Sequence, residues 1–477
     1  TYVNFDGITY AKGASVLKQL VYYVGREKFF QGINQYLNKY AYSNATLADL
    51  LHELEKASGR DLKAWSAKWL EESGINTIAT EVEENADGTI ASLTLNQTAP
   101  AEHPVLRPHR LAVGFYDEDP ATGKIVRTDR FELDVDGEST VVAAAAGKKR
   151  PAFILVNDDD LTYTKLRFDA DSLSFALANL QRFDDALARA VVWLSLWDMT
   201  RDGDLAAEKF IDTTLALLAT ETESTTFRYA LSCMSTTAWH YTAPDRRADV
   251  VKHVAKELWK LVIAAPGGSD QQFQLVTAYL GYGEEGDAEF AEHAQGLFDG
   301  SLIVAGLEID NNFTWTIINA LSSVKLIDQA GIDAQLAKRD TTENREFALG
   351  AHAVRGDAAA KEWAWNEALN NADLTNMQLE AVARGFGATP RPDLAEPYAA
   401  KYYDVVDWVW KNKSFHMAEA LLEGLYPYYA DPATLVELGH RWLADHEDAD
   451  NALKRIVRGN VESSQRTLKV RDFNAAL

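Results

Sequence analysis

The sequence predicts a multidomain α+β protein: a short helical part, then an antiparallel β-sandwich, then a large α-helical solenoid. Its 477 residues exceed the length at which a single hydrophobic core stops growing, so more than one domain is expected. The spacing of apolar residues also changes twice along the chain, from a helical period to the period of two that is typical of strands, and back. These changes place the predicted domains at residues 1–74, 75–168 and 169–477.

The first part, up to residue 74, has the apolar spacing of amphipathic helices. Its clearest segment follows Thr46, which can cap a helix together with Asp49, and stops at Gly59. The apolar stripe between them consists of Leu47, Leu50, Leu51 and Leu54. So few helices cannot enclose a large core by themselves, so we expect them to pack against sequence outside this chain.

The second part alternates apolar and polar residues over short runs. The alternating sets are Leu93 and Leu95, then Leu111, Val113 and Phe115, then Phe131, Leu133 and Val135. Turn-forming pairs such as Asp87-Gly88 and Asp136-Gly137 lie between the runs. This pattern predicts a compact sandwich of antiparallel strands. We expect the apolar run 153–156 to be its last buried strand.

The third part returns to helical spacing and keeps it to the end of the chain. Its first stripe consists of Leu187, Val191, Leu194 and Trp197. Glycine and proline punctuate the helical segments, for example at Gly203, Pro244 and Pro390. Successive helices that bury a face only against a neighbour form a solenoid of the HEAT or armadillo kind. No exact internal repeat is present, so the array is expected to be irregular.

Composition excludes several classes of protein. The chain is 47% hydrophobic and 25% charged, as globular proteins are. Its net charge of −24 repels polyphosphate backbones and anionic lipids, so neither nucleic acid nor a membrane is an expected partner. Cys233 is the only cysteine, which excludes an internal disulfide and a cysteine-based zinc cluster. We therefore expect a cytoplasmic protein with a buried structural thiol.

Tyr10 is the candidate catalytic residue. A neutral phenol can donate one hydrogen bond to a developing oxyanion, although by residue type alone a tyrosine at a helix start is usually a packing residue. Linked motifs follow it in order: Tyr10-x-Lys12-Gly13-Ala14, Gly25-x-x-x-Phe29-x-x-Gly32, Tyr42-x-Asn44-Ala45-Thr46-x-x-Asp49-Leu50 and Ser58-Gly59-x-Asp61-Leu62-x-x-Trp65. Together they resemble the M1 family of zinc aminopeptidases, of the actinobacterial aminopeptidase N type. The resemblance continues through Asn157-Asp158 to Tyr163 and, more loosely, through the solenoid.

The resemblance implies a fold and an activity. Residues 1–74 would be the helical tail of a thermolysin-like catalytic domain, and the solenoid would cover the active site. The enzyme would remove N-terminal amino acids from peptides that have a free N-terminus. In the family the tyrosine hydroxyl faces the scissile carbonyl, so the resemblance assigns Tyr10 to oxyanion stabilisation. Substrate-binding residues are not assigned.

The family's zinc-binding motif is absent from this sequence. Neither His-Glu-x-x-His nor Gly-x-Met-Glu-Asn occurs, and in the family both precede the tyrosine motif. We therefore expect this chain, which begins at Thr1, to be the C-terminal region of a longer enzyme. The zinc, its ligands and the general base would belong to the parent enzyme. This chain alone is expected to be inactive and to lack a metal site.

Other chemical motifs have simpler structural interpretations. His52-Glu53 begins like a zinc helix, but Lys56 stands where the second histidine is needed, so we expect both residues on a solvated helix surface. Gly281–Gly286 has dinucleotide-loop spacing, yet a helical segment precedes it, which favours a helix–helix turn. The acidic runs at Asp158–Asp160 and Asp202–Asp204 lack EF-hand spacing and are typical of turns.

Aromatic pairs in the solenoid could line a peptide cavity, but a core role is the simpler interpretation. These pairs are Trp363/Trp365, Tyr402/Tyr403 and Trp408/Trp410. The competing functional hypothesis is a non-enzymatic scaffold in which the solenoid and the sandwich bind a protein partner. A zinc helix encoded upstream of Thr1 would favour the enzyme, and its absence would favour the scaffold.

Overall fold

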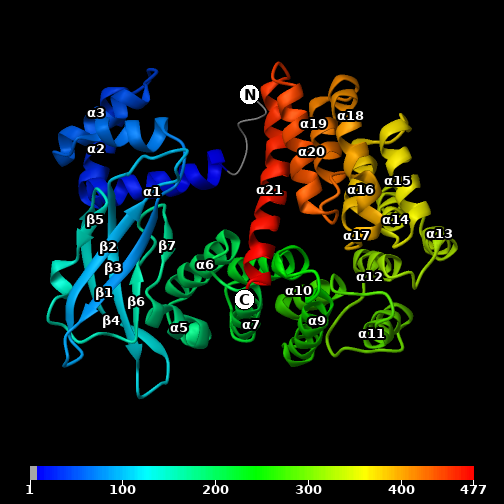
Figure 1. Ribbon diagram of the computed structural model, residues 1–477, viewed down its shortest axis with the longest axis horizontal. Coiled ribbons are helices and arrows are strands. Elements are labelled where there is room, and N and C mark those ends of the chain that lie inside the picture. Colours follow the sequence, from blue (N-terminus) through cyan, green and yellow to red (C-terminus); the bar gives the residue numbers. More distant parts are fainter. Residues whose placement is uncertain (1–7) are drawn as a thin grey trace. The chain divides into compact units, whose positions relative to one another are not determined.

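The structure, a computed structural model, describes residues 8–477, with side chains from Tyr10 onward, and divides into two compact units (Figure 1). The first unit is Thr1–Met199 and the second is Thr200–Leu477. The first contains N-terminal helices and two small sheets, and the described part of the second is helical. The predicted fold class is therefore confirmed, while the three domain boundaries stay predictions.

The N-terminal helices form around a small apolar core. Their bounds are η2 Ile8–Lys12, α1 Gly13–Val24, α2 Arg26–Lys39, α3 Leu47–Ser58, α4 Leu62–Ser66 and η3 Ala67–Glu71. As predicted, α3 begins with a reciprocal cap between Thr46 and Asp49, and it ends at Gly59, whose φ of 75° is left-handed. The core beneath these helices includes Val16, Leu20, Leu54, Trp65 and Trp69.

Two sheets follow these helices. Their strands are β1 Thr77–Glu84, β2 Ile90–Thr98, β3 His109–Glu118, β4 Ile125–Val135, β5 Ser139–Val141, β6 Phe153–Val156 and β7 Lys165–Arg167. One sheet has the order β5-β2-β1-β7 and the other β4-β3-β6. The fully buried β6 was predicted, but it is not the last strand, because β7 pairs with β1 in parallel. A strand as short as β7 is too brief to show an alternating pattern.

Helices make up the rest of the chain. Their bounds are α5 Ala170–Asn179, α6 Ala186–Asp202, α7 Ala207–Leu218, α8 Ser224–Thr236, η6 Thr237–Tyr241, α9 Arg247–Ala264, α10 Asp270–Leu280, α11 Ala288–Asp299, α12 Asn311–Ser323, α13 Gln329–Lys338, α14 Thr342–Val354, α15 Ala358–Asn370, α16 Asn376–Gly387, α17 Pro392–Ala395, α18 Ala399–Asn412, α19 Phe415–Gly424, α20 Pro432–Asp445 and α21 Asn451–Ala475. Within the described residues, no helix has an apolar stretch long enough to cross a bilayer.

The helices of the second unit stack as a solenoid does. Each helix in the series α10, α12, α14, α16, α19 and α21 contacts the next one, so these helices form one row of the stack.

Two glycines allow neighbouring helices of this row to approach closely. A Cβ on Gly385 would lie 2.6 Å from the carbonyl oxygen of Gly350, and a Cβ on Gly424 would lie 2.7 Å from Cβ of Ala383. Neither position can take a side chain without moving a helix.

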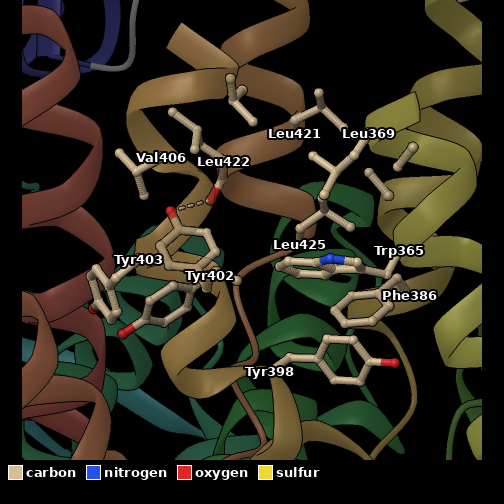
Figure 2. Close-up of a cluster of buried hydrophobic side chains, with 14 of the residues drawn as sticks. Trp365, Leu369, Phe386, Tyr398, Tyr402, Tyr403, Val406, Leu421, Leu422 and Leu425 are labelled. Atoms are coloured by element: carbon tan, nitrogen blue, oxygen red, sulfur yellow. Dashed lines mark hydrogen bonds between the residues drawn. The ribbon is translucent and has the colours of Figure 1, made fainter. Parts of the chain in front are cut away.

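Aromatic side chains fill much of the core near the end of the chain (Figure 2). Tyr402 is almost fully buried, and its hydroxyl donates a hydrogen bond of 2.8 Å to the carbonyl oxygen of Leu422. Trp365 and Tyr403 are buried in the same cluster, which confirms the predicted core role for them. Trp408 differs, since 43% of it is exposed.

Candidate active-site segment at Tyr10

Tyr10 lies on η2, the helical turn that leads without interruption into α1. Its side chain is 60% exposed. A tyrosine that served only to pack a helix start would be covered by its neighbours, so the exposure favours a role at the surface of this unit. Whether Tyr10 acts in catalysis stays a prediction.

An apolar groove of about 520 Å³ adjoins the start of α1. Its apolar walls come mainly from α1 and α3, with Val16, Leu17, Leu20, Leu47, Leu50 and Leu51. Leu17 is 55% exposed and Leu47 52% exposed. Leucines on a protein surface are unremarkable singly, but a contiguous apolar groove indicates a contact surface.

A chain of buried polar side chains connects the sandwich to α1. Gln97 Oε1 lies 2.8 Å from His109 Nε2, and His109 Nδ1 lies 2.7 Å from Thr162 Oγ1. The Thr162 hydroxyl donates a hydrogen bond of 2.9 Å to Gln19 Oε1 on α1. Burial, followed by the positive charge of Arg107, lowers the pKa of His109 to about 3, so its imidazole is neutral near pH 7. None of these residues stands out in the sequence, because a polar residue inside an apolar run has no characteristic spacing.

The acidic run after β6 binds arginine side chains. The Asp158 carboxylate is buried and accepts hydrogen bonds from the Tyr116 hydroxyl at 2.6 Å and from Arg127 at 2.7 Å. The Asp159 carboxylate accepts from Arg127 at 2.9 Å and from Arg130 at 2.8 Å. The run is therefore a structural turn, as the sequence interpretation expected, and the arginine side chains balance its charge.

The expectation that both His52 and Glu53 face solvent is wrong for Glu53. His52 is exposed, but Glu53 is 3% exposed and accepts a hydrogen bond of 2.7 Å from Lys39 Nζ. The hydrogen bond from Lys39 lowers the pKa of the Glu53 carboxyl. The cause of the error is α2, which packs against α3 and covers the side of the helix that carries Glu53.

The remaining motifs have structural roles. Gly281–Gly286 lies between the end of α10 at Leu280 and the start of α11 at Ala288, and so forms a helix–helix turn as predicted. Cys233 is buried and forms no disulfide, also as predicted. In the part of the chain that the structure describes, no three His, Cys, Asp or Glu side chains are grouped so as to hold a metal ion.

A charged cavity of about 740 Å³ lies in the second unit, along α16, α19 and α21. Its lining residues include Glu380, Arg384, His416, Glu423 and Arg455. Glu380 Oε1 lies 3.2 Å from His416 Nε2. Burial, followed by the charge of Glu419, raises the pKa of the Glu423 carboxyl. The cavity can contact polar groups of either charge, and the sequence did not indicate it because its residues come from helices far apart in the chain.

Two family models match the chain. Residues 153–466 match the ERAP1-like C-terminal domain, and residues 2–69 match the Peptidase family M1 domain. The chain belongs to the M1 aminopeptidase N family. The predicted family is therefore confirmed, and the Peptidase family M1 match includes Tyr10.

The relatives that are similar to this M1 family chain carry the name aminopeptidase. It is 39% identical over 480 residues to aminopeptidase N of Streptomyces lividans, an alignment that covers 99% of this chain and 56% of that protein. It is 32% identical over 184 residues to the mitochondrial aminopeptidase 2 of Saccharomyces cerevisiae, which covers 36% of this chain and 18% of that protein. The chain thus spans little more than half the length of its Streptomyces relative.

A solved structure shares the fold. The crystal structure of Legionella pneumophila aminopeptidase A in complex with aspartic acid has a TM-score of 0.63 with this M1 family chain. The match covers 96% of this chain and 57% of that one, at 14% sequence identity. At this identity the similarity shows the fold alone.

Proposed function

We propose that this chain is the C-terminal region of a zinc-dependent aminopeptidase that removes N-terminal amino acids from peptides. The observation that carries the proposal is the exposed phenol of Tyr10, which lies at the start of α1 within the segment that matches the Peptidase family M1 domain. The apolar groove beside α1 supports it, because it offers a surface on which the rest of a catalytic domain can pack.

Tyr10 acts as a hydrogen-bond donor in this proposal. When water attacks the scissile carbonyl, negative charge develops on the carbonyl oxygen, and a phenol held at hydrogen-bond distance stabilises that charge. A single donor of this kind typically contributes about 3–4 kcal/mol to transition-state stabilisation. Tyr10 keeps its proton and is neither the nucleophile nor the base.

The described residues of this chain do not fit a zinc site, since they include no cluster of metal-binding side chains. We assign the zinc, the general base and the group that binds the substrate's α-amine to the part of the longer enzyme outside this chain. The chain alone is accordingly predicted to be inactive. The helical unit would restrict access to the active site and so favour short peptides that have a free amino end.

A cytoplasmic location is part of the proposal. The single cysteine is buried and forms no disulfide, which suits a reducing compartment. The acidic net charge of −24 suits a soluble enzyme that acts on peptides rather than on nucleic acid.

The direct test is Tyr10→Phe in the full-length enzyme, with hydrolysis of an aminoacyl chromogenic amide as the assay. We expect kcat to fall by about 10²- to 10³-fold while KM changes little, because the lost hydrogen bond forms only in the transition state. A kcat close to that of the wild type would remove Tyr10 from the mechanism. Zinc-dependent turnover by the 477-residue chain alone, abolished by Tyr10→Phe, would contradict its predicted inactivity.

A further inference from the structure

The loop after β6 has an unusual backbone. Asn157, Asp159 and Asp160 have φ angles of 60°, 64° and 54°, in the left-handed region that residues other than glycine seldom occupy. Residues held in that region persist only where the surrounding contacts fix them. The Asn157 side chain supplies part of this restraint, because its amide exchanges two hydrogen bonds of 2.9 Å with the backbone of Thr162.

The sandwich holds the loop firmly on one side. The carboxylates of Asp158 and Asp159 bind Arg127 on β4, and Asp158 also accepts from the Tyr116 hydroxyl on β3. Hydrogen bonds between charged partners are among the strongest in proteins, particularly where a partner is buried as Asp158 is. The loop is thus a rigid part of the sandwich surface.

The same loop binds α1 on its other side. Gln19 is fully buried, and its Oε1 accepts hydrogen bonds from Thr162 Oγ1 at 2.9 Å and from the backbone amide of Tyr163 at 3.1 Å. One residue earlier, Lys18 Nζ donates to Asp160 Oδ2 at 3.1 Å and to the carbonyl oxygen of Asp159 at 3.3 Å. The Lys18 pair is partly exposed, so the Gln19 contacts provide the more specific attachment.

One polar atom of Gln19 is left unsatisfied in this arrangement. Its Nε2 is buried and has no hydrogen-bond partner among the described residues. A buried amide that leaves one donor unsatisfied is unfavourable, but an apolar side chain here would leave the Thr162 hydroxyl and the Tyr163 amide without their acceptor. The two hydrogen bonds that Gln19 accepts therefore depend on an acceptor at this position.

The attachment bears on where Tyr10 lies. Apolar contacts of Val16 and Leu20 hold α1 against the core, and the directional hydrogen bonds of Gln19 add a restraint on its rotation and axial position. Tyr10 precedes Gln19 by nine residues on one continuous helical segment, or about 14 Å at 1.5 Å per residue, so a tilt of about 10° about Gln19 would move Tyr10 by about 2 Å. A displacement of about 1 Å at a reacting group can reduce a rate by about 100-fold.

We propose that Gln19 and Thr162 are positioning residues for the Tyr10 hydroxyl. They transmit the rigid geometry of the loop after β6 to α1, and α1 carries Tyr10 to the scissile carbonyl. The proposal rests on the catalytic role of Tyr10 proposed above. It assigns a role in the reaction to a residue of the sandwich, 152 positions after Tyr10 in the sequence.

The test uses Thr162→Val and Thr162→Ser in the full-length enzyme. Thr162→Val removes the hydroxyl and is expected to lower kcat by about 10-fold with KM within about twofold, and Thr162→Ser is expected to restore kcat to within about twofold of wild type. Thr164→Val is the matched control, because the Thr164 hydroxyl bonds to the Asn76 carbonyl oxygen and not to α1. Unchanged kcat in Thr162→Val, or a loss that serine does not restore, overturns the proposal.

A double variant separates positioning from general damage. If Thr162 acts through Tyr10, adding Thr162→Val to Tyr10→Phe lowers kcat no further than Tyr10→Phe alone, whereas additive losses overturn the proposal. If Tyr10→Phe itself leaves kcat unchanged, the proposed function of Tyr10 fails instead. Amide hydrogen exchange of the 477-residue chain then still tests the attachment, since Thr162→Val and Gln19→Met should speed exchange in Gly13–Val24 by about 10-fold. Unchanged exchange overturns the attachment itself.

Discussion

Helices α2 and α18 have the same length and comparable amphipathic patterns, yet they are buried to very different extents. Of the 14 residues of α2, only Gly32 is buried. Of the 14 residues of α18, five are buried: Ala399, Tyr402, Tyr403, Val406 and Val409. Phe30 and Leu37 on α2 are each more than half exposed. An apolar stripe therefore predicts a helix, but the burial of that stripe depends on which neighbouring elements the chain supplies.

The largest expected difference between the two regions comes from matched leucine truncations. Leu421, packed in the second unit, is fully buried, so Leu421→Ala should lower the free energy of unfolding by about 2–5 kcal/mol. Leu37 on α2 is 60% exposed, so Leu37→Ala should change it by less than about 0.5 kcal/mol. Urea unfolding of the 477-residue chain, followed by circular dichroism, measures both. Equal losses would mean that the apolar face of α2 is packed after all.

A smaller effect concerns acid sensitivity of the first unit. Because the folded pKa of His109 is about 3 and an unfolded histidine has a pKa of about 6.5, the unfolded state binds an extra proton between these values. Stability should therefore fall as pH drops below about 6.5, by about 1.4 kcal/mol per pH unit.

His109→Gln should flatten this slope, as measured by urea unfolding at several pH values with hydrogen exchange to resolve the two units. His103→Gln, at an exposed position of the same unit, is the control and should leave the slope unchanged. If the stability of the His109→Gln chain depends on pH as strongly as that of the wild type, His109 is not the source of the acid sensitivity.

The smallest effect concerns two helix caps of the same kind, one in each unit. Thr46 begins α3 and Thr375 begins α16, each exposed and each in a reciprocal cap with the residue three positions later. Replacing either by alanine should cost about 0.5–2 kcal/mol. Since α16 packs against α14, α15 and α19, Thr375→Ala should speed hydrogen exchange across those helices. Thr46→Ala should speed exchange mainly in α3 and in α2, which packs against it. Faster exchange in as many helices as Thr375→Ala affects would contradict the contrast between the two regions.

Local patterns predicted the elements that local physics determines. Thr46, Asp49 and Gly59 fixed the ends of α3, and the apolar run of β6 indicated a fully buried strand. Tyr10 could be found because its motif is contiguous. Its exposure could not be predicted, since that depends on what surrounds the start of α1.

Long-range polar contacts were missed for a common reason. The partner of Gln19 lies 143 residues away at Thr162, so no spacing rule connects the two. Lys361 is another case: it is 2% exposed, and its ammonium donates to the carbonyl oxygens of Ala353 and Gly385 on two other helices. A charged residue in a helical stretch is normally assigned to the surface. Only the packing of neighbouring helices shows that such a residue is buried and satisfied.

The close approach at Gly385 and Gly424 also bears on the spacing of the helices in the array. In the row of α14, α16 and α19, these glycines let consecutive backbones come nearer than any side chain would allow. By contrast, Trp365 on α15 and Tyr402 on α18 fill the core of this unit with large rings. Contact distances between helices thus depend on whether a glycine or a large ring lies between them. Alanine at either glycine would force these neighbouring helices apart, so the two glycines set how tightly this part of the array can stack.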